Sequence, residues 1–370
     1  MTLHERLRSP GPKRILALDG GGIRGALTLG FLEKLETLLR ERHNDPKLLL
    51  CDYFDLIGGT STGSIIATLL AIGKDTAFIK KMYLEMGGEI FAEKRGIFGM
   101  LSAKFKEDAL RTQLKKHLGD RPFGDETLKT GLGIVAKRAD TGGTWPLVNH
   151  PDIPYFDRNK DIPLRYVVRA STAAPTYFKP EKINVGGGQD GAFVDGGVSM
   201  ANNPALQLFL IATLPAYNIK WATGADNLLV VSVGTGATRS RFNIEDVLDN
   251  KLWDWASAVP NMLMYDANMQ NQLILQVLSR SPHAQKIDRV LGTSIGGLLA
   301  PDKALLHYLR YDAPLNEEVM TEIGMPRPAK EIEKLREMSD AKNRFELAII
   351  GEKAAATYVK SEHLPASFDL

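Results

Sequence analysis

The stretch FDLIGGTSTGSIIATLLAI, residues 54–72, decides the fold prediction. A short apolar run typical of a buried strand comes first, two glycines follow, and a helix is expected from about Thr62. Across this junction, Gly59-Thr-Ser-Thr-Gly63 fits the pattern G-x-S-x-G. A serine in such a tight turn projects its hydroxyl above the sheet edge, beside a helix N-terminus that stabilises negative charge. The pattern indicates Ser61 as a nucleophile, and a plain turn into a helix is the alternative.

A second unit of the same kind precedes this one. Residues 14–18 form an apolar run, Asp19-Gly-Gly-Gly-Ile-Arg-Gly25 follows, and residues 25–42 have the apolar spacing of an amphipathic helix. Two successive strand–glycine–helix units predict an α/β sheet with parallel strands. The amides of the glycine loop can converge on an anion, as an oxyanion hole does. The competing dinucleotide pattern G-x-G-x-x-G lacks the second strand ending in an acid, so it is disfavoured.

The rest of the chain predicts more of the same architecture. Residues 75–120 are expected to be mostly helical, and a helix is expected over 163–175. Further strands are expected over 131–137 and 192–194, and a last one over 228–233. Three regions follow: an N-terminal arm (1–12), a catalytic core (13–240) and a mostly helical C-terminal extension (241–370) with helices near 244–280 and 328–360. No linker rich in Pro, Gly or Ser precedes the extension, so we expect it to pack on the core.

Composition narrows the class of protein. Hydrophobic residues make up 44% and charged residues 24% of the 370 residues, as in ordinary globular proteins. The net charge of +2 provides no electrostatic basis for nucleic-acid binding. The single cysteine, Cys51, excludes an internal disulfide and a thiolate zinc site. No apolar run approaches the roughly 20 residues of a membrane span, and the charged N-terminus does not resemble a signal peptide. A cytoplasmic protein is expected, with any membrane contact peripheral.

A nucleophilic serine needs a proton acceptor. None of the seven histidines follows a convincing strand at a glycine turn, although His283 and His307 have the chain order of a Ser–acid–His triad. Asp195 ends the run 192–194 and precedes two glycines. If the strands are parallel, Asp195 emerges at the same sheet edge as Ser61 and the glycine loop. An Asp that merely opens a Gly-Gly turn is the alternative, and Asp190 is the obvious decoy.

Taken in order, the glycine loop 19–25, the turn 59–63 and Asp195-Gly-Gly197 resemble the patatin-like phospholipase family. The resemblance extends to ASTAAPTYF (170–178) and VSVGTG (231–236), and it covers residues 13 to 240. It implies a three-layer α/β/α fold around a mostly parallel sheet, with the C-terminal helices added. It also implies a Ser-Asp catalytic dyad, which accounts for the missing histidine.

Carried over residue by residue, the resemblance makes Ser61 the nucleophile and Asp195 the general base. The backbone amides of Gly20, Gly21 and Gly22 would form the oxyanion hole. Arg24 would brace that loop or pair with a lipid phosphate. Gly59, Gly63 and Gly196 would support the turns. The family implies no cofactor and no metal, and the sequence has no H-E-x-x-H or EF-hand pattern.

The expected function is a lipid acyl hydrolase of the phospholipase A type, cytoplasmic and peripherally membrane-associated when active. The alternatives are a soluble esterase or thioesterase on the same dyad, or a phospholipase effector activated by a ligand such as a cyclic nucleotide. A homo-oligomer and a small-molecule activator stay open.

Two segments could reach a bilayer. GIFGML (96–101) has basic flanks, which suits an interfacial segment or a buried loop. Trp253, Trp255 and Met262-Leu-Met264 have the helical spacing of core or subunit contact more than of a membrane anchor.

Overall fold

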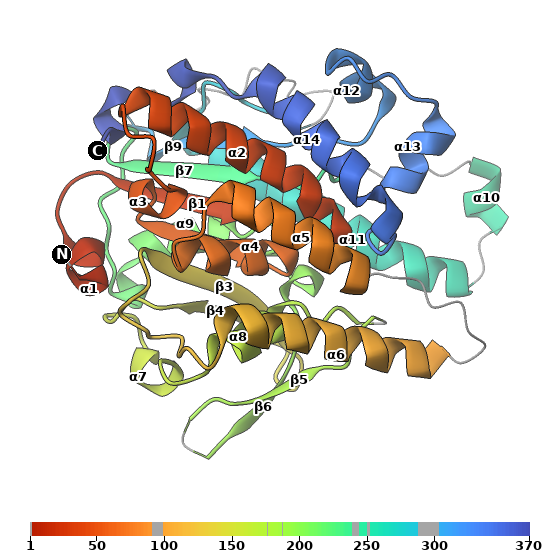
Figure 1. Cartoon of the computed structure of the whole chain (residues 1–370), viewed down its shortest axis with the longest axis horizontal. Helices are drawn as coiled ribbons and strands as arrows, with labels where there is room; N and C mark the ends of the chain where they lie inside the picture. Colours follow the sequence, from red (N-terminus) through yellow and green to blue (C-terminus); the bar gives the residue numbers. More distant parts are fainter. Residues whose placement is uncertain are drawn as a thin grey trace.

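The computed structural model describes residues 2–90, 99–175, 177–186, 188–238, 244–249, 252–287 and 303–370. Nine strands within these ranges form one sheet in the order β5-β6-β3-β2-β1-β7-β9-β8, with β4 paired to β3 (Figure 1). The strands are β1 (Lys13–Leu18), β2 (Leu56–Thr60), β3 (Gly131–Arg138), β4 (Thr144–Val148), β5 (Glu181–Asn184), β6 (Asp190–Asp195), β7 (Leu228–Val233), β8 (Ser279–Arg280) and β9 (Leu306–Tyr311). The run from β3 to β8 is parallel, whereas β4, β5 and β6 pair antiparallel.

Helices cover both faces of this sheet. They are α1 (Leu3–Arg8), α2 (Gly25–Arg42), α3 (Leu50–Tyr53), α4 (Thr62–Ala71), α5 (Thr76–Ile90), α6 (Gly99–Leu118), α7 (Phe156–Asn159), α8 (Leu164–Ser171), α9 (Ala205–Thr213), α10 (Ile244–Asp249), α11 (Leu252–Val277), α12 (Glu317–Glu322), α13 (Ala329–Leu335) and α14 (Arg344–Tyr358). One layer contains α2, α4, α5 and α14, and the other contains α9 and α11. The three-layer α/β/α architecture with a mostly parallel sheet is confirmed.

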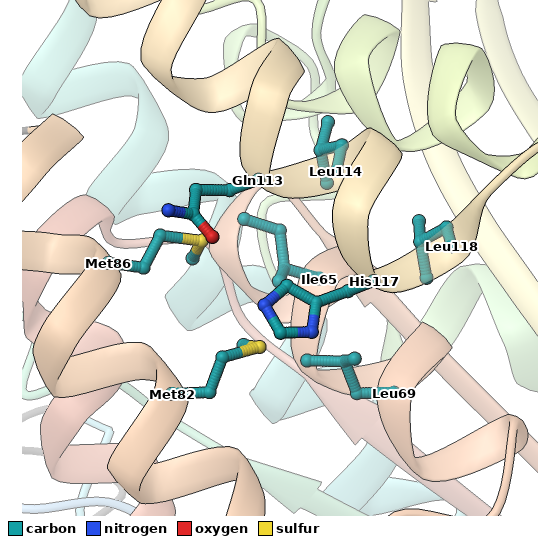
Figure 2. Close-up of a pocket in the computed structure, with 8 residues that line it drawn as sticks. All are labelled: Ile65, Leu69, Met82, Met86, Gln113, Leu114, His117 and Leu118. Atoms are coloured by element: carbon teal, nitrogen blue, oxygen red, sulfur yellow. The ribbon is translucent and has the colours of Figure 1, made fainter.

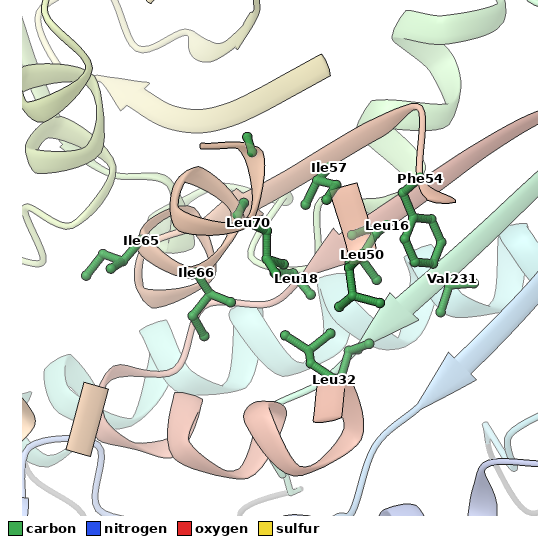
Figure 3. Packing of buried hydrophobic residues seen from close by; sticks show 14 of the residues in the cluster. Leu16, Leu18, Leu32, Leu50, Phe54, Ile57, Ile65, Ile66, Leu70 and Val231 are labelled. Atoms are coloured by element: carbon green, nitrogen blue, oxygen red, sulfur yellow. The ribbon is translucent and has the colours of Figure 1, made fainter. Parts of the chain in front are cut away.

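The core explains why the central strands are continuous apolar runs. Strands β1, β2 and β7 are covered on both faces, so Leu16, Ile57 and Val231 are fully buried. They belong to one cluster that also includes Leu32 of α2 and Ile66 of α4 (Figure 3). The two helices that follow β1 and β2 are thereby fixed on one face, with their N-termini at the carboxyl edge of the sheet.

The expected N-terminal arm is instead an ordered helix. A capping box of Thr2 and Glu5 starts α1. The Arg6 guanidinium donates to the carbonyl oxygens of Cys51, Asp52, Phe54 and Lys129 at 2.6–3.0 Å. Charged residues made this segment look like an exposed arm, but Arg6 uses its charge to bind main-chain carbonyls of the core.

The C-terminal extension contributes strands as well as helices. Strand β9 pairs with β7 in parallel, so the expectation that 228–233 is the last strand is wrong. The sequence of β9, LHYLRY, carries His307 and Arg310, which hide its strand character. Both side chains are buried. The extension therefore completes the sheet, and the segment 328–360 consists of α13, a short 3₁₀ turn and α14.

The assumption that Asp195 ends a parallel strand is also wrong, but its expected position holds. Strand β6 runs antiparallel to β3 and pairs only with the last residues of β3, with Ala136 opposite Asp195. The carboxyl end of β6 therefore arrives at the carboxyl edge of β3 from outside the sheet. This overlap places Asp195 at the edge where β1 and β2 also end.

Three histidines pack together: His283 after β8, His307 on β9 and His363 in the C-terminal tail. The rings of His283 and His363 stack with centroids 5.0 Å apart. His307 Nε2 lies 2.9 Å from the His363 carbonyl oxygen, and Tyr311 Oη lies 3.0 Å from His363 Nδ1. Burial lowers the pKa of His283 and of His307 to about 4. These imidazoles therefore hold the tail against the sheet in their neutral form.

This cluster predicts loss of stability in acid. Between the ordinary histidine pKa of about 6.5 and the folded value of about 4, the unfolded chain binds more protons, so stability falls as pH falls. We expect Tm to drop across this window, and to drop less in His283→Phe, which keeps a stacking ring but cannot titrate. Differential scanning fluorimetry at stepped pH measures both slopes, with His4→Phe outside the cluster as control. Equal slopes for wild type and His283→Phe would contradict the assignment.

Candidate functional site

The predicted turn at Ser61 is strained as the pattern requires. Ser61 lies between β2 and α4 with φ 53° and ψ −123°, outside the regions that side-chain-bearing residues normally occupy. A Cβ on Gly59 would lie 2.1 Å from the Gly63 carbonyl oxygen, and one on Gly63 would lie 2.2 Å from that of Leu18. Both positions therefore require glycine, which lets the chain reverse sharply at Ser61.

The structure brings Ser61 and Asp195 together. Ser61 Oγ donates a hydrogen bond of 2.6 Å to Asp195 Oδ2. The Gly197 amide donates to Asp195 Oδ1 at 2.7 Å, which fixes the carboxylate plane. Gly196 allows this approach, because a Cβ there would lie 2.3 Å from the Val135 carbonyl oxygen. The two side chains are in the geometry of a nucleophile and its base.

Burial changes the pKa of the Asp195 carboxyl group. Asp195 is almost fully buried, and desolvation raises its pKa to about 6, although the hydrogen bonds from Ser61 and the Gly197 amide oppose the shift. A base of this strength is mostly ionised at neutral pH and binds a proton more readily than an exposed carboxylate. Ser61 itself is only partly buried, so its hydroxyl remains accessible.

The glycine loop lies directly beside Ser61. A Cβ on Gly20 would come within 3.1 Å of Ser61 Cβ. The Gly20 amide, however, donates to the Asn202 carbonyl oxygen at 3.0 Å. Among the hydrogen bonds of the described residues, none uses the Gly21 or Gly22 amide as donor. Of the three expected oxyanion-hole amides, only Gly21 and Gly22 are therefore free to bind an anion.

Arg24 was expected to brace the glycine loop, but it makes no polar contact with the loop among the described residues. Its guanidinium is buried but forms no hydrogen bond or ion pair with them. Burial lowers its pKa, and the nearby carboxylates of Asp312 and Glu337 oppose that shift. Tyr83 contacts the loop instead: its hydroxyl donates to the Gly22 carbonyl oxygen at 2.5 Å and lies 2.5 Å from Thr62 Oγ1.

Two further residues at the site, Ser171 and Asn202, were not predicted from the sequence. Ser171 Oγ accepts from the Ser61 amide at 2.9 Å and donates to the Val135 carbonyl oxygen at 2.6 Å, so it ties the strained turn to β3. Ser171 falls within the quoted motif 170–178, which was the available signal. Asn202 holds the glycine loop by its carbonyl and by its amide, which donates to the Gly20 oxygen at 3.3 Å.

The alternative bases lie elsewhere. His283 and His307 belong to the cluster at β9, and neither forms a hydrogen bond with Ser61 or Asp195. Asp190 lies at the start of β6, where Lys182 pairs with it at 2.6 Å. In the ranges that the structure covers, no group of three or more His, Cys, Asp or Glu side chains is arranged to hold a metal.

A narrow apolar hollow, with space for about one water molecule, lies over α4, the helix that begins after Ser61 (Figure 2). Helices α4, α5 and α6 enclose it. It is lined by Ile65, Leu69, Met82, Met86, Gln113, Leu114, His117 and Leu118.

This arrangement has the geometry expected of an α/β serine hydrolase in which a carboxylate accepts a hydrogen bond directly from the serine hydroxyl. The model of the patatin-like phospholipase family matches residues 16–209, a little over half of the chain. The protein therefore belongs to the patatin-like phospholipase family, whose members are hydrolases acting on lipid esters.

The chain is similar to several individual proteins. A cGAMP-activated phospholipase from Escherichia coli (strain TW11681) is 27% identical over 84% of this chain and 83% of its own length. Patatin-17 from Solanum cardiophyllum is 30% identical over 60% of each chain. Among solved structures, VipD from Legionella pneumophila aligns with 92% of this chain and 67% of its own at 14% identity, with a TM-score of 0.38.

The raised pKa of Asp195 predicts the pH dependence of Ser61 reactivity. The labelling rate by a fluorophosphonate should rise about tenfold per pH unit below the midpoint and level off above it, because only the ionised carboxylate accepts the serine proton. The midpoint should lie near pH 6, and gel-based labelling from pH 4.5 to 8 measures it. Asp190→Asn should leave the profile unchanged. A midpoint that survives in Asp195→Asn would contradict the assignment.

Proposed function

We propose that this protein is a phospholipase A that releases fatty acids through a Ser61–Asp195 dyad. The observation that carries the proposal is the 2.6 Å hydrogen bond from a strained Ser61 to a buried Asp195. Family membership supplies the substrate class, an acyl ester of a lipid.

The first half-reaction acylates the enzyme. Asp195 accepts the Ser61 proton as Ser61 Oγ bonds to the ester carbonyl carbon. The Gly21 and Gly22 amides donate to the oxyanion, and each such donor contributes roughly 10²- to 10³-fold to the rate. The tetrahedral intermediate then collapses, the ester C–O bond breaks, and Asp195 returns its proton to the departing lysophospholipid oxygen.

The second half-reaction reverses these roles. Asp195 takes a proton from water, and the resulting hydroxide attacks the acyl carbonyl in the same oxyanion hole. Collapse of this intermediate returns the proton to Ser61 Oγ and releases the fatty acid. No step requires a group beyond Ser61, Asp195 and the loop amides.

Regulation by a small molecule is a second proposal, and it rests on one relative. The similar Escherichia coli phospholipase is named as cGAMP-activated, and the match covers most of both chains. Assays of this protein therefore need an arm with a cyclic dinucleotide. A soluble esterase or thioesterase on the same dyad differs in substrate, and short-chain esters discriminate it from a phospholipase.

The dyad is tested by fatty-acid release from mixed phospholipid vesicles in EDTA, with and without cyclic dinucleotide. Ser61→Ala and Asp195→Asn should each reduce release at least about 10³-fold, since nucleophile and base act as a unit. Asp190→Asn is the matched control, an aspartate on the same strand, and should retain wild-type release. Activity that persists in Asp195→Asn would exclude the dyad.

We propose further that the protein docks on bilayers through an apolar rim, defined as Val198, Met200, Trp255, Val259, Met262 and Leu263. All six are exposed, with Met200 at 61% and Leu263 at 64%. The four α11 residues recur at helical spacing on one face. The interpretation of Trp255, Met262 and Leu263 as core is thus wrong, whereas subunit contact stays an alternative. The side chains of Trp253 and of residues 96–101 lie outside the described ones.

The rim adjoins the catalytic edge. Met200 follows Asp195 by five residues, and Asn271 of α11 donates to the Met200 carbonyl oxygen at 2.7 Å. The first turns of α11 project from the same end of the molecule as the start of α6 (Figure 1). None of the helices in the described ranges has the length and apolar character needed to cross a bilayer. Exposed Asp266 lies one helical turn from Met262 on α11, so apolar insertion rather than attraction to anionic lipid should dominate.

The rim predicts a separation of vesicle binding from chemistry. Met262→Glu with Leu263→Glu should weaken co-sedimentation with phosphatidylcholine vesicles about tenfold or more, because charge opposes apolar insertion. Hydrolysis of a soluble short-chain ester should stay within about twofold of wild type. Ile349→Glu, an exposed apolar residue of α14, is the control. Unchanged vesicle binding, or a shift from dimer to monomer in ultracentrifugation instead, would contradict bilayer docking.

A further inference from the structure

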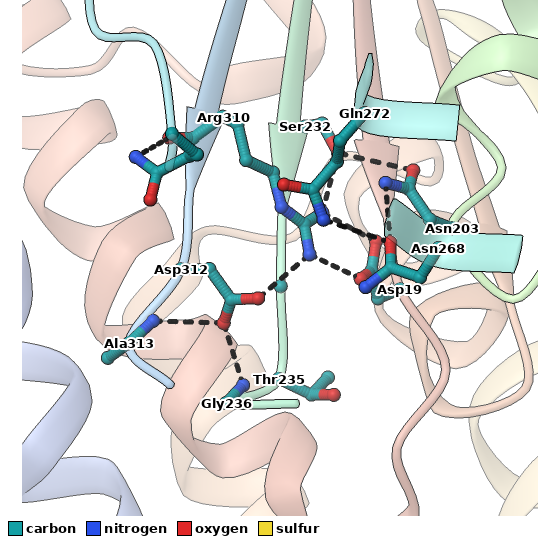
Figure 4. Close-up of polar contacts among 12 residues, drawn as sticks. Asp19, Asn203, Ser232, Thr235, Gly236, Asn268, Gln272, Arg310, Asp312 and Ala313 are labelled. Carbon is teal, nitrogen blue, oxygen red and sulfur yellow. Dashed lines mark hydrogen bonds and ion pairs between the residues drawn. The ribbon is translucent and has the colours of Figure 1, made fainter. Parts of the chain in front are cut away.

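A buried ion cluster lies beneath the glycine loop. Arg310 of β9 donates to Asp19 through both terminal nitrogens, at 2.9 Å to Oδ1 and 2.7 Å to Oδ2. The same guanidinium donates to Ser232 Oγ at 2.7 Å and to Asp312 Oδ2 at 2.8 Å (Figure 4). Arg310 and Asp19 are essentially inaccessible to solvent. Such a cluster is expensive to desolvate, and burial alone does not make it stabilising.

The ion cluster contacts both the residue that precedes the glycine loop and the turn 234–236 that packs beside this loop. Asp19 is the residue immediately before Gly20, so its carboxylate fixes where the loop leaves β1. Asp312 Oδ1 accepts from the Gly236 amide at 2.8 Å and from the Ala313 amide at 2.9 Å. Between these anchors, Thr235 Oγ1 donates to the Gly20 carbonyl oxygen at 3.1 Å. The peptide that carries the Gly21 amide is thereby held from the side of β7 and β9.

The glycine loop and the turn 234–236 are closely packed against Thr235 and Asp312. A Cβ on Gly21 would lie 2.4 Å from Thr235 Oγ1, and one on Gly234 would lie 2.1 Å from the Asp312 carboxylate carbon. A change in Asp312 therefore transmits to the 234–236 turn and from there to the loop. Displacements of about 1 Å at a reacting centre can reduce rates about 10²-fold.

We propose that Arg310, Asp312 and Thr235 form a clamp that positions the Gly21 and Gly22 amides for the oxyanion. These are positioning residues, since they act through Asp19, Gly20 and Gly236. All three lie beyond residue 209, where the family match ends, so the later part of the chain takes part in catalysis. The proposal rests on the proposed function of this loop as oxyanion hole.

The test uses two near-isosteric variants and a matched control. Asp312→Asn keeps an oxygen for the Gly236 amide but removes the charge facing Arg310, and Thr235→Val removes only the hydroxyl that contacts Gly20. Asp55→Asn is the control. Asp55 is also a buried carboxylate that binds arginines, Arg6 and Arg14, but it lies near the N-terminal end of β1, whereas the ion cluster lies at the C-terminal end. Near-UV circular dichroism checks that each variant folds.

Two readouts separate positioning from general destabilisation. Fluorophosphonate labelling of Ser61 should slow about 10- to 100-fold in Asp312→Asn and Thr235→Val, with the pH midpoint unchanged because Asp195 is untouched. Hydrogen exchange of the peptide covering residues 19–25 should speed up in both variants. In Asp55→Asn, labelling should stay within about twofold and loop exchange should not change. The double variant Asp312→Asn/Thr235→Val should lose less than the product of the single effects.

Labelling at the wild-type rate in both folded variants would overturn the clamp. Equal slowing in Asp55→Asn would overturn it too, because the effect would then be general loss of stability. If wild-type Ser61 does not react at all, the proposed nucleophile fails instead. Loop exchange still decides the clamp in that case, since unchanged protection of 19–25 in Asp312→Asn would contradict it.

Discussion

The close approach of three main-chain segments around Ser61 is the constraint on which the rest of the structure depends. Gly59 at the end of β2, Gly63 in the first turn of α4 and Leu18 at the end of β1 touch through backbone atoms alone. Side chains at the two glycines would push α4 away from β1 and relax the turn. The strain at Ser61 persists because β1, β2 and α4 are each locked in the same apolar core.

The carboxyl edge of the sheet also shows how charged groups are accommodated inside this core. Asp195, Asp19 and Arg310 are all buried. Both oxygens of Asp195 accept hydrogen bonds, from Ser61 and Gly197. Both oxygens of Asp19 accept from the terminal nitrogens of Arg310, whose Nε has no partner among the described residues. Two carboxylates raise the pKa of Arg310, so its guanidinium remains charged. Asp19 is paired with the Arg310 guanidinium, whereas Asp195 accepts a hydrogen bond from the Ser61 hydroxyl.

Local sequence, together with the family resemblance, was enough to predict that Ser61 and Asp195 lie together, but it was not enough to predict the residues around them. The turn 59–63 and the pair Asp195-Gly196 depend on backbone geometry that only certain residues allow, so their positions were readable in advance. The direction of β6 could not be predicted from its own sequence, because it is set by pairing with β3, whose residues are distant in the chain. Strand β9 was missed because Arg310 and His307 interrupt its apolar pattern, and their burial is justified only by Asp19 and the C-terminal tail, which are remote in sequence.

A dyad without histidine imposes a particular demand on its environment. An exposed carboxylate has too low a pKa to remove a serine proton effectively, so the base must be desolvated. Burial achieves this for Asp195, but the same burial would isolate the site from a lipid substrate if Ser61 were covered as well. The structure separates the two requirements, because Asp195 is buried while Ser61 stays partly open. The segment 196–200, whose Gly197 amide holds the Asp195 carboxylate, also carries Val198 and Met200 of the apolar rim, so the segment that fixes the proposed base is part of the surface proposed to contact lipid.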